Sequence, residues 1–233
     1  MEENGFLKIE DGVVKKCDKA ATEVVIPDGV TEIAKNAFFN RKNLESVVIP
    51  EGVTKIGESA FDSCDSLKSV TIPASVTEID ESAFIDCGSL KSVTIPASVT
   101  KIGHHAFSGC KSLTEVTISE GVKEISHGMF TECSALTEIT IPGSVKKIGD
   151  SAFEKCDSLA SVEIAEGVTE IDRFAFGRCK TLKSITIPAS VKKFGDAVFI
   201  GCTSLENVTL LGNTKMPKDM FDNCPSFKGV TKG

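Results

Sequence analysis

The sequence predicts an α/β repeat solenoid, in which short strands and short helical turns recur in coils stacked along one axis. Three residue types repeat at a fixed spacing of 23 residues: Leu44, Leu67, Leu90, Leu113, Leu136, Leu159, Leu182 and Leu205; Phe38, Phe61, Phe84, Phe107, Phe130, Phe153, Phe176 and Phe199; Cys64, Cys87, Cys110, Cys133, Cys156, Cys179 and Cys202. A constant period of this length with apolar residues in fixed positions is typical of a solenoid. Because one coil cannot bury its own apolar side, neighbouring coils must stabilise one another.

The first half of each coil is predicted to be a short strand. In the period LKSVTIPASVTEIDESAFIDCGS, which spans residues 67–89, Val70 and Ile72 alternate with Ser69 and Thr71. An alternation of period two in a β-branched run indicates a strand with one buried face. Pro73 then ends the strand, since proline has no N–H to donate to a neighbouring strand.

The second half of the coil turns inward again at Val76 and Ile79. The segment 81–84 then predicts a single helical turn, in which Ala83 gives room to neighbouring coils and Phe84 fills the core. The predicted coil is therefore rich in β-structure with a short helical turn before the cysteine.

The chain is predicted to have three parts. Residues 1–20 do not fit the period, and Asp11-Gly12 between two short apolar runs indicates a β-hairpin that caps the N-terminal end. Residues 21–226 form nine coils, of which the first is atypical because Arg41 replaces the cysteine. Residues 227–233 are either a C-terminal cap or the start of a truncated coil.

Composition excludes several classes of protein. With 41% hydrophobic and 25% charged residues, the chain is typical of folded proteins. A net charge of −7 argues against nucleic-acid binding, which needs clustered Lys and Arg. No apolar run is long enough to insert in a membrane. The N-terminal residues MEENGFLKIE lack the basic region followed by an apolar stretch that marks a signal peptide. We therefore expect that either the protein is intracellular or a leader has been removed.

Of the nine cysteines, the eight in the repeated position are predicted to be buried thiols rather than metal ligands, because no CxxC pair occurs. Only Cys17 lies outside the repeated position, and we expect it to be the most reactive. The histidines His104 and His127 share one repeat position and should stack about 5 Å apart. They could hold a metal, but two solvated surface histidines are the favoured interpretation. No enzyme motif is present, and we expect neither catalysis nor a cofactor.

One charged position alternates in sign from coil to coil. It holds Glu32, Lys55, Glu78, Lys101, Glu124, Lys147, Glu170 and Lys193. Opposite charges on adjacent strands attract, so this row is predicted to help fix the register of the coils.

The repeat LxxVxIPxSVxxIGxxAFxxCxSL, carried by residues 21–226, resembles the BspA-like leucine-rich repeats of bacterial and protozoan surface proteins. The resemblance implies a right-handed, curved solenoid with a parallel β-sheet on its concave face. It also implies a non-enzymatic protein-interaction module, often an adhesin, that is extracellular or at a cell surface and binds a host or bacterial surface protein. We expect a monomer. The alternative is a structural spacer or scaffold that holds other domains away from a cell surface.

In such a solenoid the outward residues of the strands form the candidate binding face. Most are Ser and Thr, with an acidic patch at Glu115, Glu138 and Glu163 between flanking lysines. The candidate residues are Lys68, Lys91, Ser92, Thr94, Glu115, Thr117, Glu138, Thr140, Glu163 and Lys183. Because the chain has no Trp and no Tyr, binding through this face should be weak, broad or multivalent.

Overall fold

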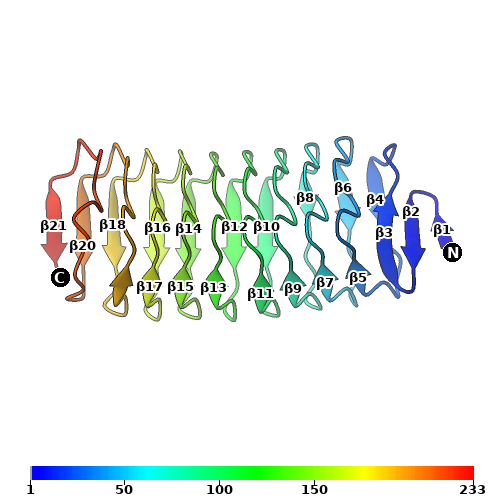
Figure 1. Cartoon of the computed structure of the whole chain (residues 1–233), viewed down its shortest axis with the longest axis horizontal. Helices are drawn as coiled ribbons and strands as arrows, with labels where there is room; N and C mark the ends of the chain where they lie inside the picture. The colour runs from blue at the N-terminus through cyan, green and yellow to red at the C-terminus, as the bar shows by residue number, and fades with distance from the viewer. Residues whose placement is uncertain (1) are drawn as a thin grey trace.

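The computed structural model describes residues 2–233 as a β-solenoid of coils stacked side by side, with the two termini at opposite ends of the stack (Figure 1). One row of strands carries the xVxI segments of successive coils. It contains β4 (Glu23–Val25), β6 (Ser46–Val48), β8 (Ser69–Val70), β10 (Ser92–Ile95), β12 (Glu115–Ile118), β14 (Glu138–Ile141), β16 (Ser161–Ile164), β18 (Ser184–Ile187), β20 (Asn207–Leu210) and β21 (Gly229–Lys232).

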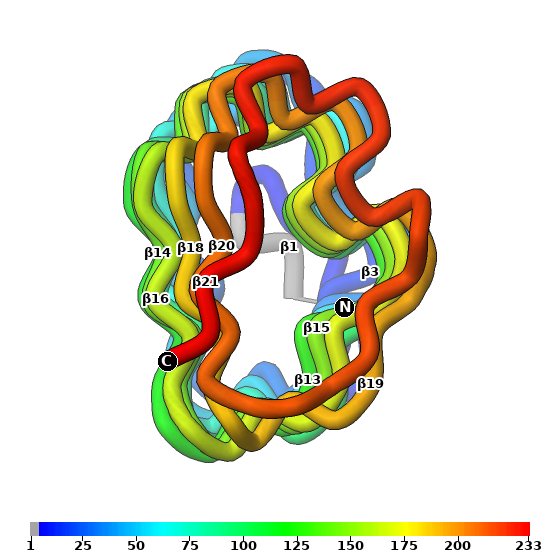
Figure 2. Tube along the Cα trace, turned by 90° about the vertical axis from the view of Figure 1, so that its left-hand side faces the viewer, coloured from blue at the N-terminus to red at the C-terminus, as the bar shows by residue number. Residues whose placement is uncertain are grey.

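A second row of two-residue strands lies across the coil from the first, as the view along the stack shows (Figure 2). It contains β5 (Glu32–Ile33), β7 (Lys55–Ile56), β9 (Glu78–Ile79), β11 (Lys101–Ile102), β13 (Glu124–Ile125), β15 (Lys147–Ile148), β17 (Glu170–Ile171) and β19 (Lys193–Phe194). In both rows the pairs are parallel and in register at equivalent repeat positions.

The predicted helical turn, and with it the α/β class, is wrong: residues 2–233 contain no helix. Two residues of the turn segment adopt left-handed backbone angles, Ser59 at φ 50° and Ser63 at φ 57° in one coil. The N–H groups of Ser59, Phe61 and Ser63 therefore point along the stack and donate to carbonyls of the next coil. Those acceptors are Glu81, Ala83 and Ile85, at 2.7–3.0 Å. Intercoil hydrogen bonds thus replace the i→i−4 bonds of a helix.

The core is a column of stacked side chains that runs through the coils. The phenylalanines Phe38, Phe61, Phe84, Phe107, Phe130, Phe153, Phe176 and Phe199 are fully buried. Successive rings lie 4.6–5.8 Å apart, nearly parallel. The strand residues follow the predicted alternation, since Val70 and Ile72 are each 6% exposed whereas Ser69 and Thr71 face solvent.

The cysteines form a second buried column, and all nine are free thiols. Each repeat cysteine donates its S–H to the carbonyl oxygen of the phenylalanine in the preceding coil, as from Cys64 to Phe38 at 3.1 Å. Burial raises the pKa of the Cys64 and Cys110 thiols to about 12. Cys17 is as fully buried as the others, so the basis for expecting it to be the most reactive is wrong.

At the N-terminal end, β1 (Glu2–Asn4), β2 (Leu7–Glu10) and β3 (Val13–Cys17) form an antiparallel meander, and β3 pairs in parallel with β5. Met1 lies outside the described residues. The Arg41 side chain occupies the place of the missing cysteine and donates from Nε to the carbonyl of Cys17 at 2.8 Å. At the other end, β21 continues the long-strand row in register with β20.

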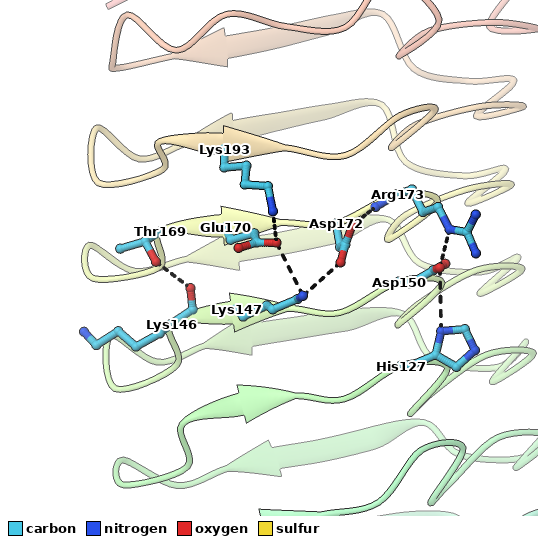
Figure 3. A network of polar contacts seen from close by, with 9 residues as sticks. All are labelled: His127, Lys146, Lys147, Asp150, Thr169, Glu170, Asp172, Arg173 and Lys193. Carbon is cyan, nitrogen blue, oxygen red and sulfur yellow. Dashed lines mark hydrogen bonds and ion pairs between the residues drawn. The ribbon is translucent and has the colours of Figure 1, made fainter.

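The alternating charged row forms ion pairs in two separate clusters, of which Figure 3 shows the second. In the second cluster, Lys147 contacts Asp172 at 3.0 Å and Glu170 at 3.4 Å, and Lys193 contacts Glu170 at 2.8 Å. An equivalent cluster joins Lys55, Glu78, Asp80 and Lys101. Glu124, between the two clusters, makes no ion pair within residues 2–233, and the short-strand sheet is interrupted between β11 and β13.

Candidate functional site

The candidate binding face is the solvent side of the long-strand row, which we call the strand face. All ten candidate residues are exposed there. The register sets Thr94 beside Thr117 on β10 and β12, and Thr140 beside Glu163 on β14 and β16. The side chains of those two strand pairs therefore form rows at one strand spacing, as expected for in-register parallel strands.

The hydrogen-bond ladder under this face is not continuous. It consists of four separate sheets: β4-β6-β8, β10-β12, β14-β16 and β18-β20-β21. Between β12 and β14 the strands stay adjacent but do not pair as a ladder. Val116 at this interruption is half-buried, whereas its equivalents Val93 and Ile139 are buried.

A hollow of about 700 Å³ opens along this interruption, and we call it the β12/β14 groove. Its apolar lining comes from Val116, Ile118, Ile139 and Pro142, and its polar lining from Thr114, Glu115, Thr117, Glu138, Thr140, Ser161 and Glu163. The structure therefore brings together five of the predicted residues, namely Glu115, Thr117, Glu138, Thr140 and Glu163. It leaves Lys68, Lys91, Ser92, Thr94 and Lys183 outside the groove.

The groove carries uncompensated negative charge. Glu115, Glu138 and Glu163 form no ion pair with any described residue, although many other carboxylates of the chain are paired. Only the hydroxyl of Thr140 approaches one of them, 3.4 Å from Glu163 Oε2. Among the flanking lysines, Lys68 is already paired with Glu45, the residue at the same repeat position in the preceding coil. A cationic segment is the chemical complement of such a groove.

Sequence comparison decides the family. Residues 7–137 and 123–232 match the family described as "BspA type Leucine rich repeat region (6 copies)". The chain belongs to the BspA-type leucine-rich repeat family.

Solved structures agree with this assignment. A leucine-rich repeat protein from Bacteroides ovatus is 33% identical over 95% of this chain and 58% of its own, with a TM-score of 0.85. The T. pallidum leucine-rich repeat protein is 32% identical over 83% of this chain and 82% of its own, with a TM-score of 0.67. A leucine-rich cell surface protein from Faecalibacterium prausnitzii is 29% identical over 91% of this chain and 79% of its own, with a TM-score of 0.52. No curated protein matches the sequence.

The chain thus spans about three fifths of the length of the Bacteroides ovatus protein. Leucine-rich repeat proteins are generally protein-interaction modules and typically non-enzymatic, because their function is carried by an extended surface rather than an enclosed site. Across residues 2–233 there is no helix long and apolar enough to cross a membrane.

The histidines of this BspA-type solenoid form a group of three, whereas the repeat positions predicted a pair. His127 lies 5.6 Å from His104, measured between ring centroids, and 4.7 Å from His105, which the sequence reasoning had not included. Burial first, and then the neighbouring His127 and His104, lower the pKa of His105. Within the described part of the chain, no group of three or more His, Cys, Asp or Glu side chains is arranged to hold a metal.

A serine, a histidine and an aspartate also meet near this group, but in an order unsuited to catalysis. Asp150 Oδ2 lies 3.8 Å from His127 Nδ1, and Ser151 Oγ donates to Asp150 Oδ1 at 2.9 Å. In a Ser-His-Asp triad the imidazole lies between the serine and the carboxylate. Here the carboxylate of Asp150 lies between Ser151 and His127, and it is also paired with Arg173.

Proposed function

We propose that this chain is an adhesion module of a cell-surface protein and that it binds a basic, extended segment of a partner protein in the β12/β14 groove. The observation that carries the proposal is the groove itself, in which an apolar floor is bordered by three carboxylates without counter-charges. An extended segment with alternating basic and apolar side chains would neutralise the border and cover the floor. Such complementarity raises association rate and specificity.

One further observation supports a surface role, and another bears on the strength of binding. The similar protein from Faecalibacterium prausnitzii is named a cell surface protein. The absence of tryptophan and tyrosine from the chain removes the residues that dominate high-affinity interfaces, so contacts should be individually weak and repeated along the strand face. Adhesins work in this multivalent regime.

The test is binding to a panel of purified extracellular-matrix proteins, measured by biolayer interferometry at several salt concentrations. The variant Glu115→Gln/Glu138→Gln/Glu163→Gln keeps the shape of the groove and removes its charge. It should bind at least tenfold more weakly than the parent and lose most of the salt dependence, because exposed charges are screened over about 8–10 Å. Its melting temperature should stay close to that of the parent.

A matched control removes the same charge elsewhere. Glu81→Gln/Glu124→Gln/Asp196→Asn replaces three exposed carboxylates outside the strand face. This control should bind like the parent. If the groove variant also binds like the parent, the groove is not the site.

The alternative function, a structural spacer, is favoured by a different observation. The coils extend in a single stack that separates the two termini by the full length of the molecule (Figure 1). A spacer should bind no panel member, and neither triple variant should differ from the parent in any binding assay.

A further inference from the structure

A proline after a long strand removes one hydrogen bond from its junction with the strand of the preceding coil. Where the position after the xVxI segment holds another residue, the N–H of that residue donates to the last carbonyl of the preceding segment. The four bonds of this kind run from Ser119 to Ile95, Ala165 to Ile141, Leu211 to Ile187 and Gly233 to Leu210, at 3.0–3.2 Å. Proline has no N–H, so this bond cannot form at Pro50, Pro73, Pro96, Pro142 and Pro188.

The extent of strand pairing follows this difference. All four junctions that have the bond pair over four positions, namely β10/β12, β14/β16, β18/β20 and β20/β21. Of the five junctions with proline, β4/β6 pairs over three positions and β6/β8 over two. The other three, β8/β10, β12/β14 and β16/β18, form no ladder within residues 2–233. Proline is thus common to every interruption of the long-strand row, although it does not abolish pairing at every junction where it occurs.

Burial shows that the interrupted junctions are more open than the intact ones. The isoleucine before each interruption keeps 6–8% of its surface exposed, whereas the isoleucine at the same repeat position before an intact junction is fully buried. The exposed set is Ile72, Ile118 and Ile164, and the buried set is Ile95, Ile141 and Ile187. These side chains are chemically identical, so their exposure reports how closely the next strand approaches.

Of the three open junctions, β12/β14 is the one that combines an opening with charge on both strands. Ile118 and Pro142 both line the β12/β14 groove. The first outward residues of the paired segments are Glu115 and Glu138 at this junction, Ser69 and Ser92 at β8/β10, and Ser161 and Ser184 at β16/β18. Charge and opening therefore have separate origins in the sequence.

We propose that Pro142 opens the β12/β14 groove, because it offers no N–H to the Ile118 carbonyl, and that it thereby determines where along the strand face a basic segment binds. This inference rests on the function proposed above, but it assigns a role to an uncharged positioning residue. Glu115 and Glu138 supply the charge of the site. Pro142 keeps β14 from closing onto β12, and so leaves the apolar floor beside Ile118 accessible.

Amide hydrogen exchange tests the opening without any partner. Pro142→Ala gives β14 the residue that β16 has at this position, Ala165, whose N–H donates to Ile141 at 3.0 Å. The new amide at position 142 should donate to Ile118, and its protection should come within about tenfold of that of Ala165. Exchange as fast as in an unstructured chain would show that the missing N–H does not hold the junction open, and would overturn the proposal.

The probe for binding is the blocked peptide GKVKVKG, with the uncharged peptide GQVQVQG as its control. Pro142→Ala should weaken binding of GKVKVKG at least fivefold, because the closed junction covers the floor of the groove. The remaining binding should keep the salt dependence of the parent, since all three carboxylates stay in place, whereas Glu115→Gln/Glu138→Gln/Glu163→Gln should lose it. Unchanged affinity in Pro142→Ala, with the new amide protected, would refute the role of Pro142 in binding.

Pro96→Ala is the matched control, because it adds the same N–H at the same repeat position after β10. It should close the β8/β10 junction, shown by protection of its new amide, and leave binding of GKVKVKG unchanged, because β8 and β10 do not line the groove. Equal losses of binding in Pro96→Ala and Pro142→Ala would overturn a specific role of Pro142. If the parent does not bind GKVKVKG, the function proposed above fails, and exchange at position 142 still decides whether Pro142 opens the groove.

Discussion

Two neighbouring phenylalanines offer a direct test of how the core is built. Phe38 is fully buried, and its ring lies 4.6 Å from that of Phe61. Phe39, the next residue, is 44% exposed. The substitutions Phe38→Ala and Phe39→Ala remove the same atoms from adjacent positions of the same coil. The difference between their effects on the free energy of unfolding therefore reports on the surroundings of the two rings.

The expected costs follow from burial. Replacing a fully buried phenylalanine by alanine costs about 3–5 kcal/mol, which includes the cavity and the lost stacking contact. Phe39 has only about half of its surface covered, so Phe39→Ala should cost about 1 kcal/mol at about 25 cal/mol per Å² of apolar surface. We therefore expect a difference of about 2–4 kcal/mol in the free energy of unfolding.

Urea titration followed by circular dichroism measures this difference in the free energy of unfolding. Hydrogen exchange shows which coils have lost stability. Because coils contact only their neighbours, Phe38→Ala should speed exchange mainly in the N-terminal meander and the first two coils. Equal losses in the two variants, or a larger loss for Phe39→Ala, would show that the assignment of the phenylalanine column is wrong.

The remaining predictions concern titration and thiol reactivity. The pKa of His105 is lowered in the folded state, so the unfolded chain binds more protons and stability should fall as the pH drops through 6.5 toward the folded pKa. His105→Asn, which suits the left-handed backbone, should lose less stability than the parent between pH 7 and pH 5 in urea titrations; an equal loss would contradict a role for this imidazole. Under native conditions Cys224, which is 9% exposed, should react first with a thiol reagent, and Cys110, which is fully buried, should react far more slowly. Peptide mapping after timed labelling checks this order, and early modification of Cys110 would show that the cysteine column opens readily.

The buried column could be predicted from the sequence because the period is constant. Any residue that recurs every 23 positions must lie at the same place in each coil, and an apolar residue that recurs must face the core. This reasoning separates Phe38 from Phe39 and Val70 from Thr71 without coordinates, and the observed burial agrees. The same logic predicted outward side chains at Glu115 and its neighbours.

The helical turn was predicted from local pattern alone and was wrong. The segment Glu81–Phe84 looks helical in isolation, but Ser82 is left-handed at φ 56°, and its N–H donates to the carbonyl of His104 in the next coil. A neighbouring coil supplies acceptors that no single coil displays in its own sequence. The competition between intracoil and intercoil hydrogen bonds is therefore resolved only when the coils are stacked.

The sequence by itself determined the stacked architecture, the buried positions and the location of the acidic patch at Glu115, Glu138 and Glu163. Only the tertiary structure decided where the ladder between strands is interrupted, that the three carboxylates of the acidic patch share one groove, and how the alternating charges divide into clusters. Glu78 and Glu124 occupy the same repeat position, yet only Glu78 is paired, in the cluster that Asp80 joins. Side chains at equal positions in the period have unequal neighbours, and electrostatic pairing and groove formation depend on those neighbours rather than on the period.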